Sequence, residues 1–387
     1  GVKELMDGIV QLMPNPLERI RRTADDSQLV PKEDGDAAAF VFKSALDPFI
    51  GQMAYIRVLT GKIASNSDML NLTTGERERI GQLLLLTGKT QTPVEEVCPG
   101  CICGVAKHKQ TKTGETLGAS RNNHAMPKQE YPNPVISFAL YAVKSGDEDK
   151  IVSGLQKLAE CDPTLVLSRN DETHETILSG MGEMHVNNAI KNLKALSKVD
   201  VRLELPKIPY RETIQGRGEA AYRHKKQSGG HGQFAEVHLR LEPNPEGFKF
   251  VNAIVGGAIP KNFIPAVEKG VHEAMERGPL AGCTVQNMTV TVFDGKYHEV
   301  DSSEMAFKIA TRRAFKEAME KAKPAMLEPI MNVKITIPDN YTGDVTGDLN
   351  HKRGRILGMN MEDGLQVLEA EVPMAEIQKY ATELRSM

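Results

Sequence analysis

The hydrophobic rhythm of the chain changes at Pro134, and the pattern that follows constrains the fold more than any other feature. Residues 135–142 alternate as a strand before a helix; strands around 165–167 and 176–178 come next, then a second helix and a last strand over 199–205. The apolar stripes of the two helices are Ile151, Leu155 and Leu158, and Val186, Ile190 and Leu193. This βαββαβ order predicts a ferredoxin-like domain.

The same plan starts again after Pro329. A first strand carries Val333, Ile335 and Ile337, and a helix lies near 345–349. Strands around 356–361 and 365–372 follow, and then a helix with Ile377, Tyr380 and Leu384. The sequence stops before a closing strand, so we expect a second ferredoxin-like domain that lacks its last strand. In the usual 4-1-3-2 strand order, the strand at 331–337 would then be an exposed edge.

The first third of the chain has a different pattern. Residues 1–22 read as the end of a helix that Pro14 and Pro16 stop, and the polar stretch 23–36 reads as a linker. Apolar residues between 38 and 118 then fall in short strands separated by glycines at 51, 61, 75, 88, 100 and 114. Short strands at such regular turn spacing predict a β-barrel.

A further domain lies between the two ferredoxin-like patterns, and two helices mark it. One runs from Pro265 to Gly278, and the other follows Asp301-Ser302-Ser303-Glu304, a capping-box pattern in which Asp301 and Glu304 would satisfy free helix amides. Alanines at 306, 310, 314 and 318 form a ridge on the second helix that we interpret as core.

A basic, glycine-rich loop in this domain is the best clue to function. The segment Lys226-Gln227-Ser228-Gly229-Gly230-His231-Gly232-Gln233 lies between two runs that read as strands, so it is a hairpin tip. Gly230, Gly232 and Ala235 match the spacing of a dinucleotide fingerprint, but that motif needs a helix after the glycines, and a strand follows. Basic residues at 223, 225 and 226 suit RNA phosphates. A solvated turn explains the same residues equally well.

A second loop, 294–300, carries Tyr297 and His298 directly before the capping pattern. A histidine at a loop tip can donate to phosphate or stack on a base, and a tyrosine can stack as well. The alternative is a histidine that only packs or caps locally.

Composition sets the limits within which these loops can act. A chain of 387 residues exceeds the size of one core, so several domains are expected. The net charge of −3 excludes a uniformly basic surface, so any nucleic-acid contact must be local. No apolar run approaches the ~20 residues that span a bilayer, and the start lacks a signal peptide, which predicts a cytoplasmic protein.

The five cysteines offer a metal site as an alternative. Cys98, Cys101 and Cys103, with His108 nearby, supply ligand types that Zn²⁺ accepts. The surrounding apolar residues and the absence of a second downstream pair favour cysteines buried in strands. We therefore expect no metal.

Five motifs stand out along the chain, in this order: Asp47-Pro48-Phe49-Ile50-Gly51, Gly180-Met181-Gly182-Glu183-Met184-His185, Gln227-Ser228-Gly229-Gly230-His231-Gly232-Gln233, Tyr297-His298-Glu299-Val300-Asp301-Ser302-Ser303-Glu304 and Gly343-Asp344-Val345-Thr346-Gly347-Asp348-Leu349-Asn350. In residues and in order, they resemble the motifs of translation elongation factor G. The resemblance implies a multidomain α+β fold. Its parts would be a remnant of a GTPase domain (1–22), a β-barrel domain II (38–118), a ferredoxin-like domain III (133–206), a domain IV like ribosomal protein S5 (207–328) and a shortened ferredoxin-like domain V (329–387).

The function that the resemblance implies is ribosomal translocation of tRNA and mRNA. Residues 226–233 with Tyr297 and His298 would contact RNA in the decoding region, and Gly182, Glu183 and His185 would relay the nucleotide state. The ribosome, rRNA, tRNA and mRNA would be the partners of a monomer. GTP and Mg²⁺ would bind only a GTPase domain, because no GxxxxGK[ST] motif occurs here.

One departure from the family motif leaves a second function open. His231 stands where the family usually has an arginine, and Phe234-Ala235-Glu236 replaces the more usual tyrosine and glycine stretch. Histidine lacks the fixed charge and bidentate reach of a guanidinium. A paralogue that acts in ribosome recycling or ribosome protection is therefore the alternative.

Overall fold

The computed structural model describes residues 1–47, 51–106, 111–120, 125–227 and 232–387. These residues form two compact units, one of 1–170, 175–206 and 381–387 and the other of 171–174 and 207–380. None of the helices formed by the described residues combines the length and apolar character that crossing a membrane requires.

The first unit begins with a helix, α1 (Val2–Leu12), which ends before Pro14 as expected and buries none of its side chains. The polar stretch after it is more ordered than a linker. Strands β1 (Arg21–Arg22) and β2 (Gln28–Leu29) pair antiparallel. The Thr23 hydroxyl donates to the Asp25 carboxylate at 2.6 Å, and the Thr23 amide donates to the Ser27 carbonyl at 3.0 Å. Polar side chains here therefore close a hairpin, which their composition alone does not reveal.

The strands predicted between 38 and 118 are present. They are β3 (Ala38–Asp47), β4 (Gly51–Thr60), β5 (Ile63–Ala64), β6 (Asp68–Asn71), β7 (Arg77–Arg79), β8 (Leu83–Thr87), β9 (Thr90–Val94), β10 (Glu96–Val97), β11 (Ile102–Ala106) and β12 (Thr116–Gly118). Eight of them form one sheet in the order β7-β6-β12-β3-β4-β11-β8-β9 around a fully buried core that includes Val41, Ile56 and Leu83. The predicted barrel is open in its hydrogen bonding, because β7 and β9 do not pair within the described residues. All six turn glycines named above have positive φ, between +59° and +93°, which side chains disfavour.

The ferredoxin-like prediction for the next module is confirmed. Its elements are β13 (Ile136–Ala142), α2 (Glu148–Cys161), β14 (Val166–Asn170), β15 (Glu175–Gly180), α3 (Glu183–Ser197) and β16 (Val201–Glu204). The sheet is antiparallel in the order β14-β15-β13-β16, which is the 4-1-3-2 arrangement read from the other edge. Leu155, Leu178 and Leu193 are fully buried in its core, so the helical stripes face the sheet.

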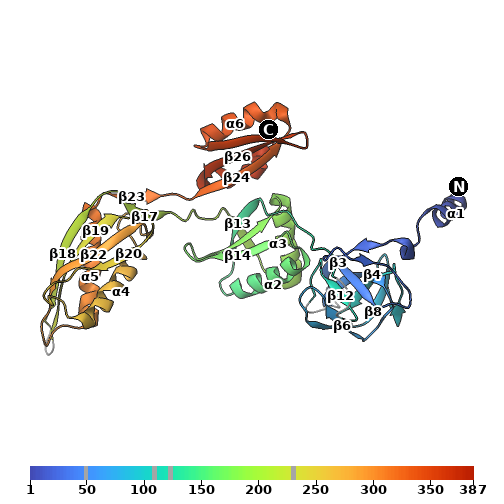
Figure 1. Ribbon diagram of the computed structural model, residues 1–387, viewed down its shortest axis with the longest axis horizontal. Coiled ribbons are helices and arrows are strands. Elements are labelled where there is room, and N and C mark those ends of the chain that lie inside the picture. Colours follow the sequence, from blue (N-terminus) through green and yellow to red (C-terminus); the bar gives the residue numbers. More distant parts are fainter. Residues whose placement is uncertain (48–50, 107–110, 121–124, 228–231) are drawn as a thin grey trace. The chain divides into compact units, whose positions relative to one another are not determined.

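Residues 207–328 of the second unit, which we call the tip domain, contain two sheets. Strands β17 (Arg211–Ile214), β21 (Thr284–Val285) and β23 (Pro324–Leu327) form the smaller sheet. Strands β18 (Gly218–Lys226), β19 (Gln233–Pro243), β22 (Met288–Lys296) and β20 (Lys249–Asn252) form the larger one, in that spatial order. Helix α5 (Glu304–Lys321) packs on β18 and β19, and helix α4 (Ile264–Met275) packs beside α5 (Figure 1).

The alanine ridge of α5 is core, as predicted. Ala306, Ala310, Ala314 and Ala318 are all fully buried. The helix approaches the sheet so closely that a Cβ on Gly218 would lie 2.1 Å from the Ala318 carbonyl oxygen. A residue without a side chain is therefore required at the start of β18.

The last module contains β24 (Ile330–Ile337), α6 (Thr342–His351), β25 (Arg355–Glu362), β26 (Leu365–Pro373), α7 (Met374–Ile377) and α8 (Tyr380–Leu384). The sheet order is β24-β26-β25, so among the described residues β24 is an edge strand, as predicted from the missing closing strand. The single helix expected to carry Ile377, Tyr380 and Leu384 is instead two short helices, and no contact in the structure explains the break.

Candidate nucleic-acid interface

The first predicted loop closes a long, regular hairpin. Strands β18 and β19 pair from Gly218 and Leu241 to Lys226 and Gln233, which confirms that the segment is a hairpin. Lys226, Gln227 and Gln233 are exposed, and Ser228, Gly229, Gly230 and His231 lie outside the described residues. Because β19 begins at Gln233, no helix follows the glycines, which confirms the rejection of a dinucleotide site.

The second predicted loop leads from β22 into α5. Gly295, near the end of β22, packs so tightly that a Cβ there would lie 2.4 Å from the Glu236 carbonyl oxygen. The N-cap of α5 is Ser303, whose hydroxyl accepts the Ala306 amide at 3.2 Å. The predicted capping role of Asp301 is wrong, because the extended backbone at Ser303 already brings that hydroxyl over the helix amides and leaves Asp301 outside the first turn.

Asp301 instead joins the two loops. Its carboxylate accepts the Gly232 amide at 2.9 Å, and its carbonyl accepts the Phe234 amide at 2.8 Å. The Ser302 hydroxyl donates to the Phe234 carbonyl at 2.8 Å. We call the exposed surface made by residues 226–227, 232–234 and 297–303 the two-loop tip.

The surroundings of His298 agree with both interpretations made from the sequence, a histidine that can donate to an external group and a histidine that is held by local contacts. Its Nδ1 accepts the Val300 and Asp301 amides at 3.3 Å each, and its own amide donates to the Ser302 hydroxyl at 2.8 Å. A ring that accepts at Nδ1 carries its proton on Nε2. The side chain is 56% exposed, so local packing orients the ring and leaves a donor for an external acceptor. Tyr297 beside it is 43% exposed.

The positive charge of the tip is smaller than the sequence suggested. Arg223 pairs with Glu236 at 2.5 Å, and His238 contacts the other Glu236 oxygen at 3.0 Å. Burial opposes ionisation of Glu236, but the hydrogen bonds from His238 and Arg223 outweigh it and lower the pKa of this carboxyl group. The charge of Arg223 is therefore balanced, and exposed Lys225 and Lys226 remain to attract phosphate.

The three residues of the second predicted site lie where α3 begins. Gly182 precedes the helix, Glu183 is exposed in its first turn, and His185 follows two residues later. His185 accepts the Met181 amide at Nδ1 (3.1 Å), and its Nε2 lies 2.9 Å from Asp162. The tip belongs to one compact unit and this segment to the other.

Asp162 connects this segment to the end of α2. Partial burial opposes its ionisation, but hydrogen bonds from the Thr164 hydroxyl and amide and from His185 outweigh burial and lower the pKa of its carboxyl group. The carboxylate therefore stabilises the fold above the unfolded-state pKa, and this contribution is lost as the pH falls through the folded-state pKa.

Asp162→Asn is expected to lower the free energy of unfolding of this module at pH 7. It should also make that free energy decrease less steeply as the pH falls. The side chain is 42% exposed, so solvent screening keeps the effect at or below about 1 kcal/mol. Hydrogen exchange of the α3 amides between pH 3 and pH 7 measures it. Glu160→Gln, a change at an exposed residue of α2 two positions before Asp162, is the control, and an equal effect in both variants would contradict the assignment.

The cysteines are arranged differently from the expectation. Only Cys103 is a buried strand cysteine; Cys98 and Cys101 lie half-buried in the turn before β11, where the Cys101 amide donates to the Cys98 carbonyl at 3.1 Å. Burial, and secondarily Cys101, raises the pKa of Cys103 to about 12. His108 is outside the described residues, and across the described ranges no three His, Cys, Asp or Glu side chains gather closely enough to hold a metal ion.

The fold and the two-loop tip define a modular protein in which hydrogen bonds join two loops of an α+β domain. Four family models match the chain in sequence order: elongation factor G domain 2 at 36–120, domain III at 131–205, domain IV at 206–323 and the elongation factor G C-terminus at 325–387.

A crystal structure of a protein from Thermus thermophilus is also similar, with a TM-score of 0.81 and 39% sequence identity. The match covers 99% of this chain and 56% of that one. The chain belongs to the elongation factor G family and spans about half the length of this relative.

Proposed function

We propose that this chain is the ribosome-binding part of a translational GTPase that promotes translocation of tRNA and mRNA. The observation that carries the proposal is the Asp301 link, which joins two loops into one exposed tip. Such a tip presents backbone amides, lysines and an oriented imidazole together, the groups that contact nucleic-acid phosphates. The four family matches support a role in translation elongation.

In this proposal the two-loop tip enters the decoding region of the small subunit. Lys226 approaches phosphate, Gln227 and Gln233 donate hydrogen bonds, and Tyr297 stacks on a base. His298 donates from Nε2 because its Nδ1 is occupied by the Val300 and Asp301 amides. Ser228, Gly229, Gly230 and His231 complete the RNA contact in the same proposal.

The remaining parts of the proposal follow from the family. Gly182, Glu183 and His185 relay the nucleotide state, and the ribosome with its rRNA, tRNA and mRNA is the partner of a monomeric cytoplasmic protein. GTP and Mg²⁺ bind to a GTPase domain and not to these 387 residues, because the 387 residues contain no phosphate-loop motif.

His298→Ala in the full-length factor is expected to slow translocation about tenfold, the effect of losing one hydrogen bond to a charged group. Ribosome-dependent GTP hydrolysis should stay nearly unchanged, because the tip contains no phosphate-loop motif. Single-turnover translocation and GTPase assays measure the two steps. Lys249→Gln, a change at an exposed residue of β20, is the control, and an unchanged translocation rate in His298→Ala would refute the role of the tip.

The alternative is a paralogue that acts in ribosome recycling or ribosome protection. The observation that favours it is His231 in place of the arginine usual in the family. A recycling assay run beside the translocation assay separates the two functions, because activity in recycling without translocation would select the paralogue.

A further inference from the structure

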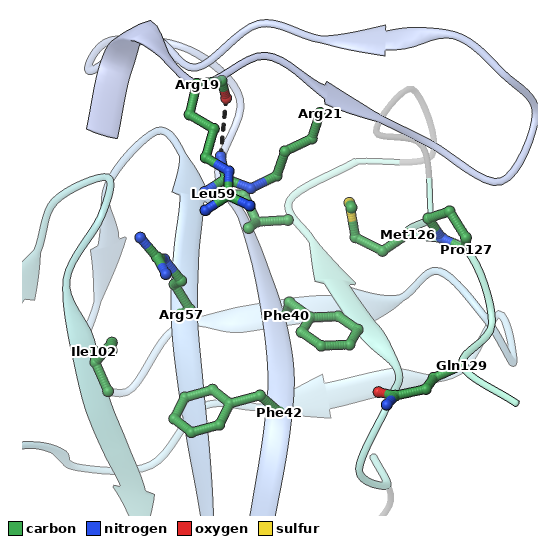
Figure 2. Close-up of a pocket in the computed structure, with 10 residues that line it drawn as sticks. All are labelled: Arg19, Arg21, Phe40, Phe42, Arg57, Leu59, Ile102, Met126, Pro127 and Gln129. Atoms are coloured by element: carbon green, nitrogen blue, oxygen red, sulfur yellow. Dashed lines mark hydrogen bonds between the residues drawn. The ribbon is translucent and has the colours of Figure 1, made fainter. Parts of the chain in front are cut away.

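A pocket of about 380 Å³ opens on the β3–β4–β11 face of the first sheet (Figure 2). Phe40, Phe42 and Arg57 line it from the strands, and Arg19 and Arg21 line it from the segment before the sheet. Met126 and Pro127 face them from the segment after β12. None of the sequence motifs pointed to this place, which we call the arginine pocket.

The arginine pocket concentrates positive charge that the described residues do not balance. Its described lining includes Arg19, Arg21 and Arg57 and no Asp or Glu. The Arg57 Nε is buried and has no hydrogen-bond partner among the described residues. Among the described residues, the Arg21 guanidinium donates to an uncharged group, the Arg19 carbonyl, at 3.1 Å. A buried donor without a partner is costly, so this geometry favours an acceptor from outside.

The electrostatics of Arg21 point the same way. Burial first, and then the charges of Arg57 and Arg19, lower the pKa of its guanidinium. Guanidinium groups stay protonated in proteins, so the lowered pKa reflects a charge that is partly buried and, secondarily, repelled by two neighbouring guanidinium groups. An anion placed between the three groups would relieve this repulsion, and phosphate suits their fork-like geometry best.

Apart from Gln129, the rest of the pocket is aromatic and apolar. Phe40 is half-buried, Phe42 is 40% exposed, and Leu59 is buried. Figure 2 shows the Phe40 and Phe42 rings on the same side of the pocket, away from the Arg19 and Arg21 head groups. Exposed aromatic faces bind nucleobases by stacking, so arginines beside aromatic rings favour a nucleotide over an acidic peptide.

We infer that the arginine pocket binds a nucleotide, with the phosphate between Arg19, Arg21 and Arg57 and the base against Phe40 and Phe42. Its volume lies at the lower end of the roughly 300–1,000 Å³ found for small-molecule sites. The nucleotide is either a free mononucleotide or one residue of single-stranded RNA, which share this chemistry. The site is independent of the two-loop tip.

Binding to the 387-residue chain can be measured with two probes, uridine monophosphate by calorimetry and fluorescein-labelled tetrauridylate by anisotropy. Arg19→Gln with Arg21→Gln is expected to weaken binding of the recognised probe at least about tenfold, because two charge-assisted hydrogen bonds are lost. Phe40→Leu is expected to weaken it about tenfold through lost stacking. A mononucleotide that binds identifies a small-molecule site; binding of the tetranucleotide alone identifies RNA.

The matched control is Arg77→Gln with Arg79→Gln, which removes two exposed charges from β7 of the same sheet. This control variant should bind within about twofold of the parent, because Arg77 and Arg79 do not line the pocket and exposed charges are screened by salt. Crosslinking with 4-thiouridylate should label peptides that contain Phe40, Phe42 or Met126.

Three results would overturn the inference. The first is that neither probe binds at millimolar concentration. The second is that the pocket variant and the β7 control lose probe binding equally. The third is that a hexaglutamate peptide at equal concentration displaces the bound probe. The last would show that the pocket takes acidic peptide and not nucleotide. Circular dichroism spectra of the variants would show whether a loss reflects unfolding, and the Phe40→Leu variant, which keeps all charges, tests the base contact separately.

Discussion

Glu212→Ala is expected to destabilise the tip domain by about 3 kcal/mol, the cost of leaving several backbone amides without their carboxylate acceptor. Glu212 is fully buried in β17. Its carboxylate accepts the amides of Leu280, Ala281 and Cys283 at 2.9–3.1 Å. Removal of the carboxylate leaves these three partly buried amides without their acceptor.

The same cluster explains a glycine that the sequence pattern read only as the end of α4. A Cβ on Gly278 would lie 2.1 Å from a Glu212 oxygen, so the loop can close around the carboxylate only with glycine there. Hydrogen exchange of the 278–286 amides measures the effect, with protection expected to fall about 100-fold at 3 kcal/mol. The control is Glu246→Ala, at an exposed turn of the same domain. Equal protection in both variants would show that the cluster contributes little.

Asp301→Ala is expected to separate the two loops of the tip. The carboxylate that receives the Gly232 amide is lost, and a Cβ on Gly232 would stand only 3.0 Å from it, so the contact is close and specific. Exchange of the Gly232 and Phe234 amides should accelerate about tenfold, which corresponds to the loss of one charge-assisted hydrogen bond. Translocation by the full-length factor should fall at least as far as in His298→Ala, because all tip groups lose their common position.

Two further variants make this prediction specific. Asp301→Asn keeps an oxygen acceptor and should retain most of the protection, whereas Glu299→Gln changes a charge in the same loop without touching Gly232. Fast exchange in Glu299→Gln, or normal exchange in Asp301→Ala, would mean that the Asp301 carboxylate does not hold the loops together. Amide exchange measured by NMR resolves both positions.

Much of the fold could be predicted because its determinants are local. The ferredoxin-like module followed from apolar stripes at helical spacing, such as Leu155 and Leu193, and from strands that alternate. The buried alanine ridge of α5 and the β18–β19 hairpin were also predictable, since one face of a helix and the chemistry of a turn are visible in sequence.

The failures involve partners that are distant in sequence. Asp301 and Glu304 fit a capping box, but the acceptor of the Gly232 amide lies 69 residues away, and only the paired strands bring it near. The barrel was predicted from strand spacing, which does not specify whether β7 and β9 pair. Arg57 stands in an apolar strand, a signal that could have been noticed, but Arg19 and Arg21 approach it only through the fold.

Helix α5 gives the position of Asp301 a mechanical meaning. The helix has 18 residues, and at 1.5 Å per residue it is about 27 Å long. Asp301, which holds the hairpin loop, precedes its first turn, and Ala318, which touches Gly218 at the start of β18, lies in its last turn. The hairpin is therefore held against α5 at both ends, at its loop through Asp301 and at its base through the close approach of Gly218 to Ala318. Displacing the loop relative to the base of the hairpin would require breaking one of these two contacts.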